Sequence, residues 1–261
     1  MAPAAGAIER LGSAALGAFV RAGSIALLGA RTVGGIFSRP FEFRETIRQM
    51  EYLGMRSLSI SLLTALFTGM VMALQFAVGL ERFGSKEYVA LIGALAIIRE
   101  LGPVLTSVVV GGRVGSGITA EIGSMQVTEQ IDAIRALGAN PVKKLVVPRF
   151  VAMLIVLPML AFLADVTGVA GGLIIGTFQL GLSPHTYVYN VINGVGLDDL
   201  FSGIAKTVFF AAGITLIACR EGMATTGGTE GVGQATTRTG VSSLIFVFVA
   251  DFFLTKLFLI L

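Results

Sequence analysis

The sequence is poor in the residues that build soluble enzymes and metal sites. It has no tryptophan, one cysteine, one histidine and few charges. The single Cys219 excludes a disulfide framework and a cysteine-based zinc site. His185 stands beside Pro184 in a predicted loop, and we interpret it as a solvated residue, which leaves no histidine for a metal or catalytic cluster. Charged residues make up 13% of the chain, against about 25% in a soluble domain, so the composition predicts an integral membrane protein.

A phosphate-binding loop is also missing. The segment GGRVGSG at 111–117 is rich in glycine but has no lysine, so it does not match the G-x-x-x-x-G-K-[ST] pattern. We therefore expect no cofactor in this chain, and any ATP and Mg²⁺ would be bound by a partner. A formal charge of +3 is compatible with nucleic-acid binding, but the basic residues sort by membrane side instead. No nucleic-acid partner is expected.

Long apolar runs are what the sequence does contain. A membrane-spanning helix needs about 20 mostly apolar residues. Five stretches meet this length: residues 57–80, 88–112, 150–180, 200–219 and 241–261. The 34 glycines suit close packing between such helices. We expect an all-α fold, with a five-span domain at 57–261 and a separate N-terminal segment at 1–56.

The lysines and arginines between the spans indicate how the chain is oriented, because they concentrate on the cytoplasmic side of membrane proteins. Seven lie in residues 1–56, five in 113–149 and two in 219–240. The other side has only Arg82 and Lys86, and its second loop, 181–199, has none. Fourteen against two predicts a cytoplasmic N-terminus and an outer C-terminus.

Two amphipathic stretches precede the first predicted span, and Pro40 separates them. Their apolar residues recur at helical spacing: Ile8, Leu11, Ala15 and Phe19, then Phe43, Ile47 and Met50. Arginines lie on other faces of both stretches, and such helices typically lie in the membrane interface. We expect two interfacial helices, with ordinary packing helices as the alternative.

Six charged residues fall at or near membrane depth, where each costs at least about 2.5–3.5 kcal/mol on insertion scales. They are Arg99, Glu100, Asp165, Lys206, Asp251 and Lys256. Three are positive and three negative, which indicates pairing across helices. Sequence neighbours do not face each other on a helix, so Arg99 and Glu100 need other partners. The preferred pair is Glu100 with Lys206, whereas Lys256 stands near a helix end and can reach water.

These charges have two interpretations. They can simply fix the register of the helices, as buried ion pairs often do. Alternatively, Arg99 or Glu100 faces a cavity and handles a polar headgroup. Pro103 removes a backbone donor just after this pair, so we expect a bend there, which favours a cavity wall.

The segment between the second and third spans predicts a short cytoplasmic helix at about 128–138. Thr128 can cap a helix that begins at Glu129. Gly138 suits a left-handed helix end, and Pro141 cannot continue the helix. Its placement between two spans suits docking to a partner, although a plain surface helix would have the same pattern.

Sequence motifs make the prediction of a docking helix more specific. DAIRALG at 132–138 resembles the EAA-type coupling motif of ABC importer permeases, with Asp132 in place of Glu and Ile134 in place of the second Ala. A closer resemblance lies in three runs: RELGPVLTSVVVGGRVGSGITAEIGSM (99–125), TEQIDAIRALGANPVKKLVVPR (128–149) and ATTRTGV (235–241). They are similar to the MlaE, or YrbE, family of permeases, over about residues 40–261.

The resemblance implies a homodimeric permease in a bacterial inner membrane. Such permeases belong to ABC transporters that move phospholipids or related lipids between the inner and outer membranes. The implied partners are a cytoplasmic ABC ATPase dimer, an MCE-domain ring protein and, in some systems, a small accessory cytoplasmic protein. The implied ATPase contacts are Glu129, Asp132, Arg135 and Gly138. The implied lining of a lipid cavity at the dimer axis is Met72, Gln75, Phe76, Leu80, Phe83, Arg99 and Glu100.

Three other functions stay open on the sequence. An ion-coupled secondary transporter would use Glu100 and Asp251 to relay protons. A membrane enzyme acting on lipids is disfavoured by the lack of a histidine or metal-ligand cluster. A structural scaffold for an MCE-domain partner would need no nucleotide hydrolysis.

Overall fold

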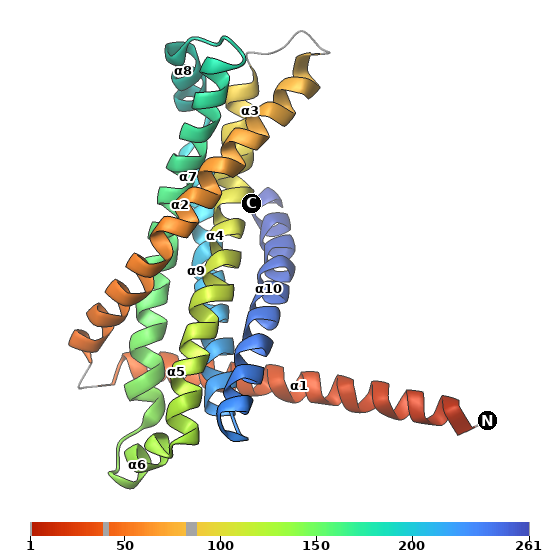
Figure 1. Cartoon of the computed structure of the whole chain (residues 1–261), viewed down its shortest axis with the longest axis vertical. Helices are drawn as coiled ribbons and strands as arrows, with labels where there is room; N and C mark the ends of the chain where they lie inside the picture. Colours follow the sequence, from red (N-terminus) through yellow and green to blue (C-terminus); the bar gives the residue numbers. More distant parts are fainter. Residues whose placement is uncertain (1, 39–41, 82–87, 261) are drawn as a thin grey trace.

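The structure is a bundle of long helices. It is a computed structural model that describes residues 2–38, 42–81 and 88–260, with the backbone alone at 2–15, 18 and 81. Five of its helices are long and apolar enough to cross a membrane: Phe43–Leu80, Tyr88–Val127, Val142–Phe178, Leu197–Met223 and Gly228–Ile260. They form one upright bundle, and the described residues contain no strand (Figure 1). The predicted all-α fold with five spans is confirmed.

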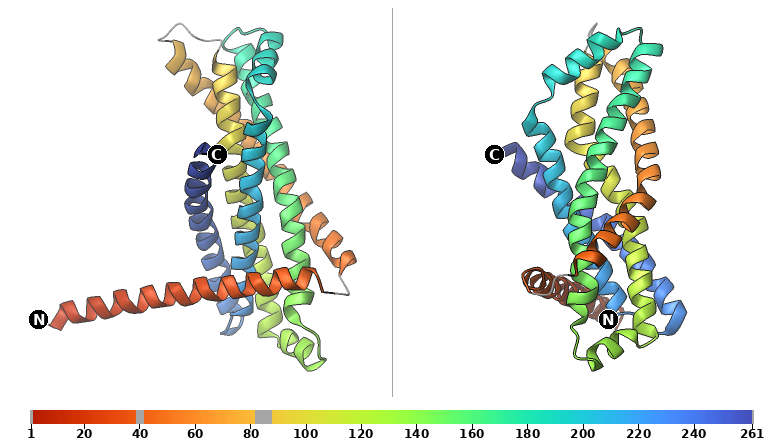
Figure 2. Two further views of the ribbon diagram at one scale, coloured as in Figure 1. Left: turned by 180° about the vertical axis from the view of Figure 1, so that it is seen from behind. Right: turned by 90° about the vertical axis from the view of Figure 1, so that its left-hand side faces the viewer.

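Helix α1 (Ala2–Ile36) leaves this bundle at a steep angle, and its N-terminal end projects far from the other helices (Figures 1 and 2). Large apolar side chains on its described part are exposed, including Leu16, Phe19 and Leu27. An apolar helix surface that extends sideways from a spanning bundle suits the membrane interface, and the interfacial placement of α1 stays a prediction.

The second amphipathic stretch is not a separate helix. It forms the first part of α2 (Phe43–Glu81), which continues without a break into the first span. No proline interrupts these residues, and Leu53 is buried against the bundle, so the helix stays intact as it enters the membrane. The boundary expected at residue 56 is therefore not a helix boundary. Pro40, expected to separate the two stretches, lies outside the described residues.

The second span is a composite helix. It consists of α3 (Tyr88–Ala96), α4 (Gly102–Val110) and α5 (Ser116–Val127), joined by the π-helical turns η1 (Ile97–Leu101) and η2 (Gly111–Gly115). Pro103 cannot donate a backbone hydrogen bond, and the wide turn η1 immediately before it accommodates the proline. The helix runs past the predicted end at 112 because Val114, Ile118 and Ile122 are buried in the same core.

The remaining spans are η3 (Val142–Val146) with α7 (Val147–Phe178), then α9 (Leu197–Met223) and α10 (Gly228–Ile260). Glycines let α2 and α7 approach closely. A Cβ at Gly69 would lie 1.8 Å from the carbonyl oxygen of Gly168, and one at Gly171 would lie 2.2 Å from that of Leu66. Small residues at such contacts are the usual means of packing helices in lipid.

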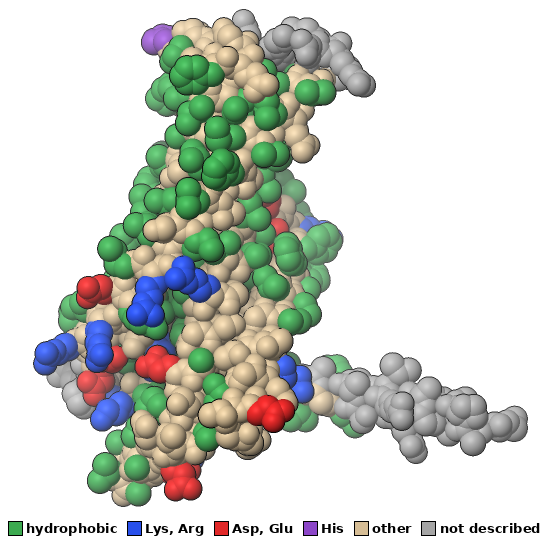
Figure 3. All heavy atoms as spheres, in the orientation of Figure 1, with side chains coloured by type: hydrophobic (Ala, Val, Ile, Leu, Met, Phe, Trp, Pro, Cys, Tyr) green, Lys and Arg blue, Asp and Glu red, His purple; other side chains and the backbone are tan. Residues whose placement is uncertain are grey.

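Two short helices mark the ends of the bundle. Helix α8 (Pro184–Gly194) lies at one end, within the predicted loop 181–199, and α6 (Gln130–Ala136) lies at the other (Figure 1). Tyr187 anchors α8, because it is 2% exposed and packs where a Cβ at Gly172 or Gly176 would stand. This burial raises the pKa of Tyr187 to about 12. Lys and Arg side chains gather toward the α6 end in the face shown in Figure 3.

Helix α6 is shorter than predicted, and its start differs. Thr128 does not cap it, since the Thr128 hydroxyl donates a hydrogen bond to the carbonyl of Ser124 at 2.8 Å. The chain instead turns at Glu129, which takes a left-handed φ of 60°. The cap prediction was wrong because α5 reaches Val127, so Thr128 closes the preceding helix. Gly138 has the left-handed conformation that was predicted, with φ of 75°.

Candidate functional site

A buried lysine joins three spans at the centre of the site. The Lys206 side chain on α9 is 1% exposed, and its Nζ lies 2.7 Å from Glu100 Oε2 and 3.4 Å from Asp251 Oδ1. The same ammonium donates hydrogen bonds to Thr255 Oγ1 at 2.7 Å and to the carbonyl of Arg99 at 3.1 Å. The predicted Glu100–Lys206 pair is confirmed, and Asp251 joins it.

The local sequence explains this placement. Pro103 has no N–H, so it cannot donate to the carbonyl of Arg99 four residues earlier, and Lys206 supplies a donor instead. Gly203 lets α9 pack closely against the second span, because a Cβ at this position would lie 2.2 Å from the carbonyl oxygen of Ile98. Lys206 stands three residues after Gly203 and so lies on the same face of α9. The ammonium thus reaches the irregular turn η1.

Arg99 points to a different partner. Its Nε lies 3.2 Å from Asp199 Oδ1 near the start of α9. The Arg99 and Glu100 side chains are 40% and 38% exposed, whereas Lys206 is buried. The site therefore presents a cation and a carboxylate at its surface, with the neutralising lysine underneath.

A groove of about 330 Å³ contains three of these charged side chains. It lies between the second span, α9 and α10, and its polar members are Arg99, Glu100, Ser202, Lys206 and Thr255. Its apolar walls are Ile92, Leu95, Ala96, Phe258 and Leu259. A groove with apolar walls and a few charges at one place is suited to an amphiphile, whose chains and headgroup need different surroundings.

The α2 residues implied as cavity lining lie elsewhere in the single chain. Phe76 and Leu80 pack on a small core of Ala73, Ala77 and Val89. Met72 is partly buried and Gln75 exposed, and the described lining of the charged groove includes neither of them. Phe83 lies outside the described residues.

Asp165 does not belong to the charge cluster. It is 2% exposed in the middle of α7, and neither of its carboxylate oxygens has a hydrogen-bond partner among the described residues. The expectation that it pairs with another intramembrane ion is wrong, because its side chain packs against Gly102 rather than toward a cation. Lys256, the outermost of the six charges, is exposed near the end of α10.

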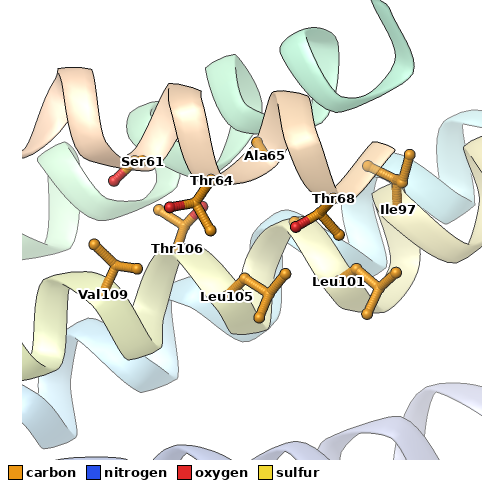
Figure 4. Close-up of a pocket in the computed structure, with 10 residues that line it drawn as sticks. Ser61, Thr64, Ala65, Thr68, Ile97, Leu101, Leu105, Thr106 and Val109 are labelled. Atoms are coloured by element: carbon orange, nitrogen blue, oxygen red, sulfur yellow. The ribbon is translucent and has the colours of Figure 1, made fainter. Parts of the chain in front are cut away.

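A second groove separates α2 from α4. Ser61, Thr64 and Thr68 of α2 line one side, and Thr106 lies on the other (Figure 4). Gly102 also belongs to the lining. Ser61 is 2% exposed, and its hydroxyl has no hydrogen-bond partner in the described chain. This groove carries hydroxyl groups but no charged residue.

The short helix α6 is largely exposed at the basic end of the bundle. Ile131 anchors it, being fully buried, while Leu137 is 86% exposed at its far end. Asp132 and Arg135 form an exposed ion pair at 2.6 Å, and Glu129 is also exposed. The surface around α6 therefore combines a free apolar side chain with charges, as a docking surface does.

Two of the sequence motifs meet at this end of the bundle. Thr119 of α5 and Thr239 of α10 are both fully buried, and their hydroxyls lie 2.8 Å apart. Thr119 also donates to the carbonyl of Ala218 on α9 at 3.0 Å, and Ser116 donates to that of Thr236 at 3.1 Å. These bonds join α5, α9 and α10. The motif threonines therefore hold the bundle together near α6.

Comparisons with known proteins agree with these observations. The family model of the permease MlaE matches residues 46–257. A probable ABC transporter permease of Rickettsia felis is 37% identical over 236 residues, covering 90% of this chain and 91% of that protein. A second one, from Synechocystis, is 42% identical over 214 residues, covering 82% and 81%.

A relative in Haemophilus influenzae has a more specific name, the intermembrane phospholipid transport system permease protein MlaE. It is 37% identical over 233 residues, covering 88% of this chain and 89% of that protein. The family model spans most of the bundle, including the charged residues of the groove and α6. The chain is a multi-pass membrane protein that belongs to the MlaE permease family.

Proposed function

We propose that this chain is the membrane subunit of an ABC transporter that moves phospholipids between the inner and outer membranes. In this proposal two copies pair in the inner membrane, a cytoplasmic ATPase dimer binds their α6 helices, and an MCE-domain ring protein receives or delivers the lipid at the other end. A small accessory protein can join on the cytoplasmic side. Family membership and the name of the Haemophilus relative support this assignment.

The observation that carries the proposal is the exposed tip at α6. The chain has no phosphate-binding loop of its own, so a nucleotide-driven cycle needs a surface that transmits force from another subunit. Helix α6 contacts α5, and the chain leads from it through η3 into α7, so a push on α6 reaches two spans. Leu137 is 86% exposed there and offers an apolar anchor for the ATPase.

The charged groove supplies a place for the cargo. A phospholipid headgroup carries a phosphate, and Arg99 presents a partly exposed guanidinium beside apolar walls that suit acyl chains. Met72, Gln75, Phe76, Leu80 and Phe83 would then contribute from the dimer axis, where two copies meet. Separation of the spans would open this groove, and closure of the ATPase pair would expel the lipid.

The docking surface is tested by one matched pair of substitutions. Leu137→Ser removes the exposed apolar side chain at α6, and Leu197→Ser removes one that is 85% exposed near α8 at the opposite end. After co-expression with the ATPase and purification in mild detergent, Leu137→Ser is expected to lose most of the bound ATPase and its stimulated hydrolysis, whereas Leu197→Ser keeps both. Equal ATPase retention by the two variants would contradict the proposal.

The energy source separates this proposal from an ion-coupled transporter. Lipid transfer from proteoliposomes that contain the whole complex is expected to stop when ATP is replaced by a non-hydrolysable analogue. Adding an uncoupler should leave the transfer unchanged. Transfer that persists without hydrolysis and collapses with the uncoupler would instead favour proton relay through Glu100 and Asp251.

A further inference from the structure

One carboxylic acid in the membrane core has an environment unlike that of the other charges. Lys206 is buried but meets two carboxylates, a hydroxyl and a carbonyl. Asp165 is equally buried, yet both of its oxygens lack a partner among the described residues. Intramembrane ionisable residues that do not pair are costly, and their retention usually reflects a function.

The charged groups on the helices around Asp165 are engaged elsewhere. On the second span, Arg99 binds Asp199 and Glu100 binds Lys206. On α9, Lys206 faces Glu100 and Asp251. On α2, no charged residue occurs between positions 57 and 80. The acid is therefore enclosed by uncharged groups on each of these sides.

A glycine shapes the pocket that holds the carboxyl group. A Cβ at Gly102 would lie 1.7 Å from Asp165 Oδ1, so the acid occupies the space that a side chain at 102 would take. One turn further along α7, Gly168 packs against Ile97 and the carbonyl of Ala65. Here α7, α2 and the second span meet, and Asp165 lies at their junction.

The groove between α2 and α4 leads to the same junction. Gly102, Ile97 and Ala65 all belong to its lining, together with hydroxyls that include Ser61 (Figure 4). Ser61 and Ser57, one turn apart on α2, are buried with no hydrogen-bond partner among the described residues. Unpaired buried hydroxyls are where water binds once there is room for it.

We propose that Asp165 is a proton-binding site of the membrane core. With α7 packed against the second span, the proton stays on a carboxyl oxygen, because an unpaired anion would be far costlier there than the neutral acid. When the helices separate and water enters through the groove, the O–H bond breaks and the proton passes to water. The carboxylate left behind then favours the hydrated, open groove.

The protonation state can be measured directly on the full-length protein in lipid nanodiscs, with no ATPase present. At pH 7 the infrared spectrum is expected to contain a protonated carboxylic-acid carbonyl band that disappears in Asp165→Asn. Glu51 is exposed and lies far along the sequence from Asp165, so Glu51→Gln is the control and should leave the band unchanged. A spectrum that is the same with and without Asp165 would overturn the proposal.

Groove hydration gives a second readout. Cys219 is fully buried, so a Cys219→Ala background carrying Thr64→Cys reports on the groove alone. A water-soluble thiol reagent should label this cysteine several-fold faster with Asp165 than with Asp165→Asn at alkaline pH, and equally fast at acidic pH. With Asn140→Cys, exposed beyond α6, the two backgrounds should match at every pH. If the ratio of the Thr64→Cys labelling rates with Asp165 and with Asp165→Asn stays constant with pH, the proposal is overturned.

A folding defect in Asp165→Asn would not leave the question open. Leucine has a similar shape and no charge, and Asp165 has no partner to lose among the described residues. If the acid is neutral, Asp165→Leu is expected to purify and melt like the parent. Failure of both Asn and Leu variants, with Asp165→Glu intact and without a protonated-carboxyl band in its infrared spectrum, would show that the anion is required and would overturn the proposal. None of these readouts depends on lipid transport, so they stand apart from the function proposed above.

Discussion

At the scale of single residues, the distinctive feature is a buried lysine that bridges two acidic side chains from different spans. Lys206 bonds Glu100 and lies within ion-pair distance of Asp251. Its partners come from two other helices, so the cluster fixes the register of three spans around it. This agrees with the structural interpretation of the charges, while the partial exposure of Arg99 and Glu100 agrees with the functional one.

Removing the ammonium should therefore cost stability. Lys206→Met leaves Glu100 and Asp251 facing each other, and we expect a loss of about 3 kcal/mol in the free energy of unfolding, because breaking a buried pair strands the remaining charge. The loss is measured by unfolding the protein in detergent while monitoring its circular dichroism. Adding Glu100→Gln and Asp251→Asn should restore most of the loss, and a triple variant as unstable as Lys206→Met would contradict the charge argument. Exchanging the charges of Lys206 and Glu100 would be a poorer test of this pair, because K206E places a carboxylate beside Asp251.

The burial of Tyr187 predicts how stability changes at alkaline pH. Burial raises the pKa of Tyr187 from 10.0 to about 12, so the folded protein favours the neutral phenol. The unfolded chain ionises first as pH rises, and the stability that Tyr187 contributes is present below pH 10 and lost as pH climbs toward 12. Melting temperature should fall over this range in the parent and less in Tyr187→Phe. Tyr189→Phe, at an exposed position on the same helix, should behave like the parent.

The sequence allowed the Glu100–Lys206 pair to be predicted, because both charges stand near the middle of otherwise apolar spans. Thr255 gives no such signal, since a threonine in an apolar helix is unremarkable by composition. Asp199 lies in a predicted loop, so its pairing with Arg99 needed the three-dimensional position of α9. Asp165 was expected to pair because it is one of three negative charges that balance three positive ones among the intramembrane residues. Counting charges does not reveal which way a side chain points.

At the scale of helices, the close contact between α2 and α7 depends on glycine. Gly69→Ala would place a methyl group 1.8 Å from the carbonyl oxygen of Gly168, which forces the helices apart. We expect Gly69→Ala to reduce the yield of folded protein and lower its melting temperature. Gly79→Ala, on the same helix with open space around it, should be neutral. Size-exclusion profiles and melting curves of the two variants make the comparison. Identical behaviour of both variants would contradict the role of Gly69 in packing α2 against α7.

The number of spans followed from hydropathy, whereas the ends of the helices did not. Apolar runs predicted the spans, but α5 and the first part of α2 continue beyond these runs because residues such as Ile122 and Leu53 are buried by neighbouring helices. Helix α8 was assigned to a loop because its sequence is mixed, and the anchor Tyr187 reveals itself only through packing on α7. The end of α6 was predictable, since Gly138 and Pro141 act locally.

At the scale of the whole molecule, the bundle has two different ends. Basic residues, α1 and α6 lie toward one end, and α8 with its exposed apolar side chains lies at the other (Figures 1 and 3). The excess of lysine and arginine predicts that the α6 end faces the cytoplasm. An ATPase can reach α6 only in this orientation, so the proposed coupling depends on it.

Single cysteines test this orientation in intact cells. The native Cys219 is fully buried, so a Cys219→Ala background leaves one reporter at a time. Asn140→Cys lies in the exposed segment after α6, and Asn193→Cys lies at the exposed end of α8. A reagent that crosses the outer but not the inner membrane should label Asn193→Cys readily and Asn140→Cys only after the inner membrane is permeabilised. The reverse pattern would put α6 on the outer side, where no cytoplasmic ATPase can push it, and both the docking surface and the ATP-driven cycle would have to be abandoned.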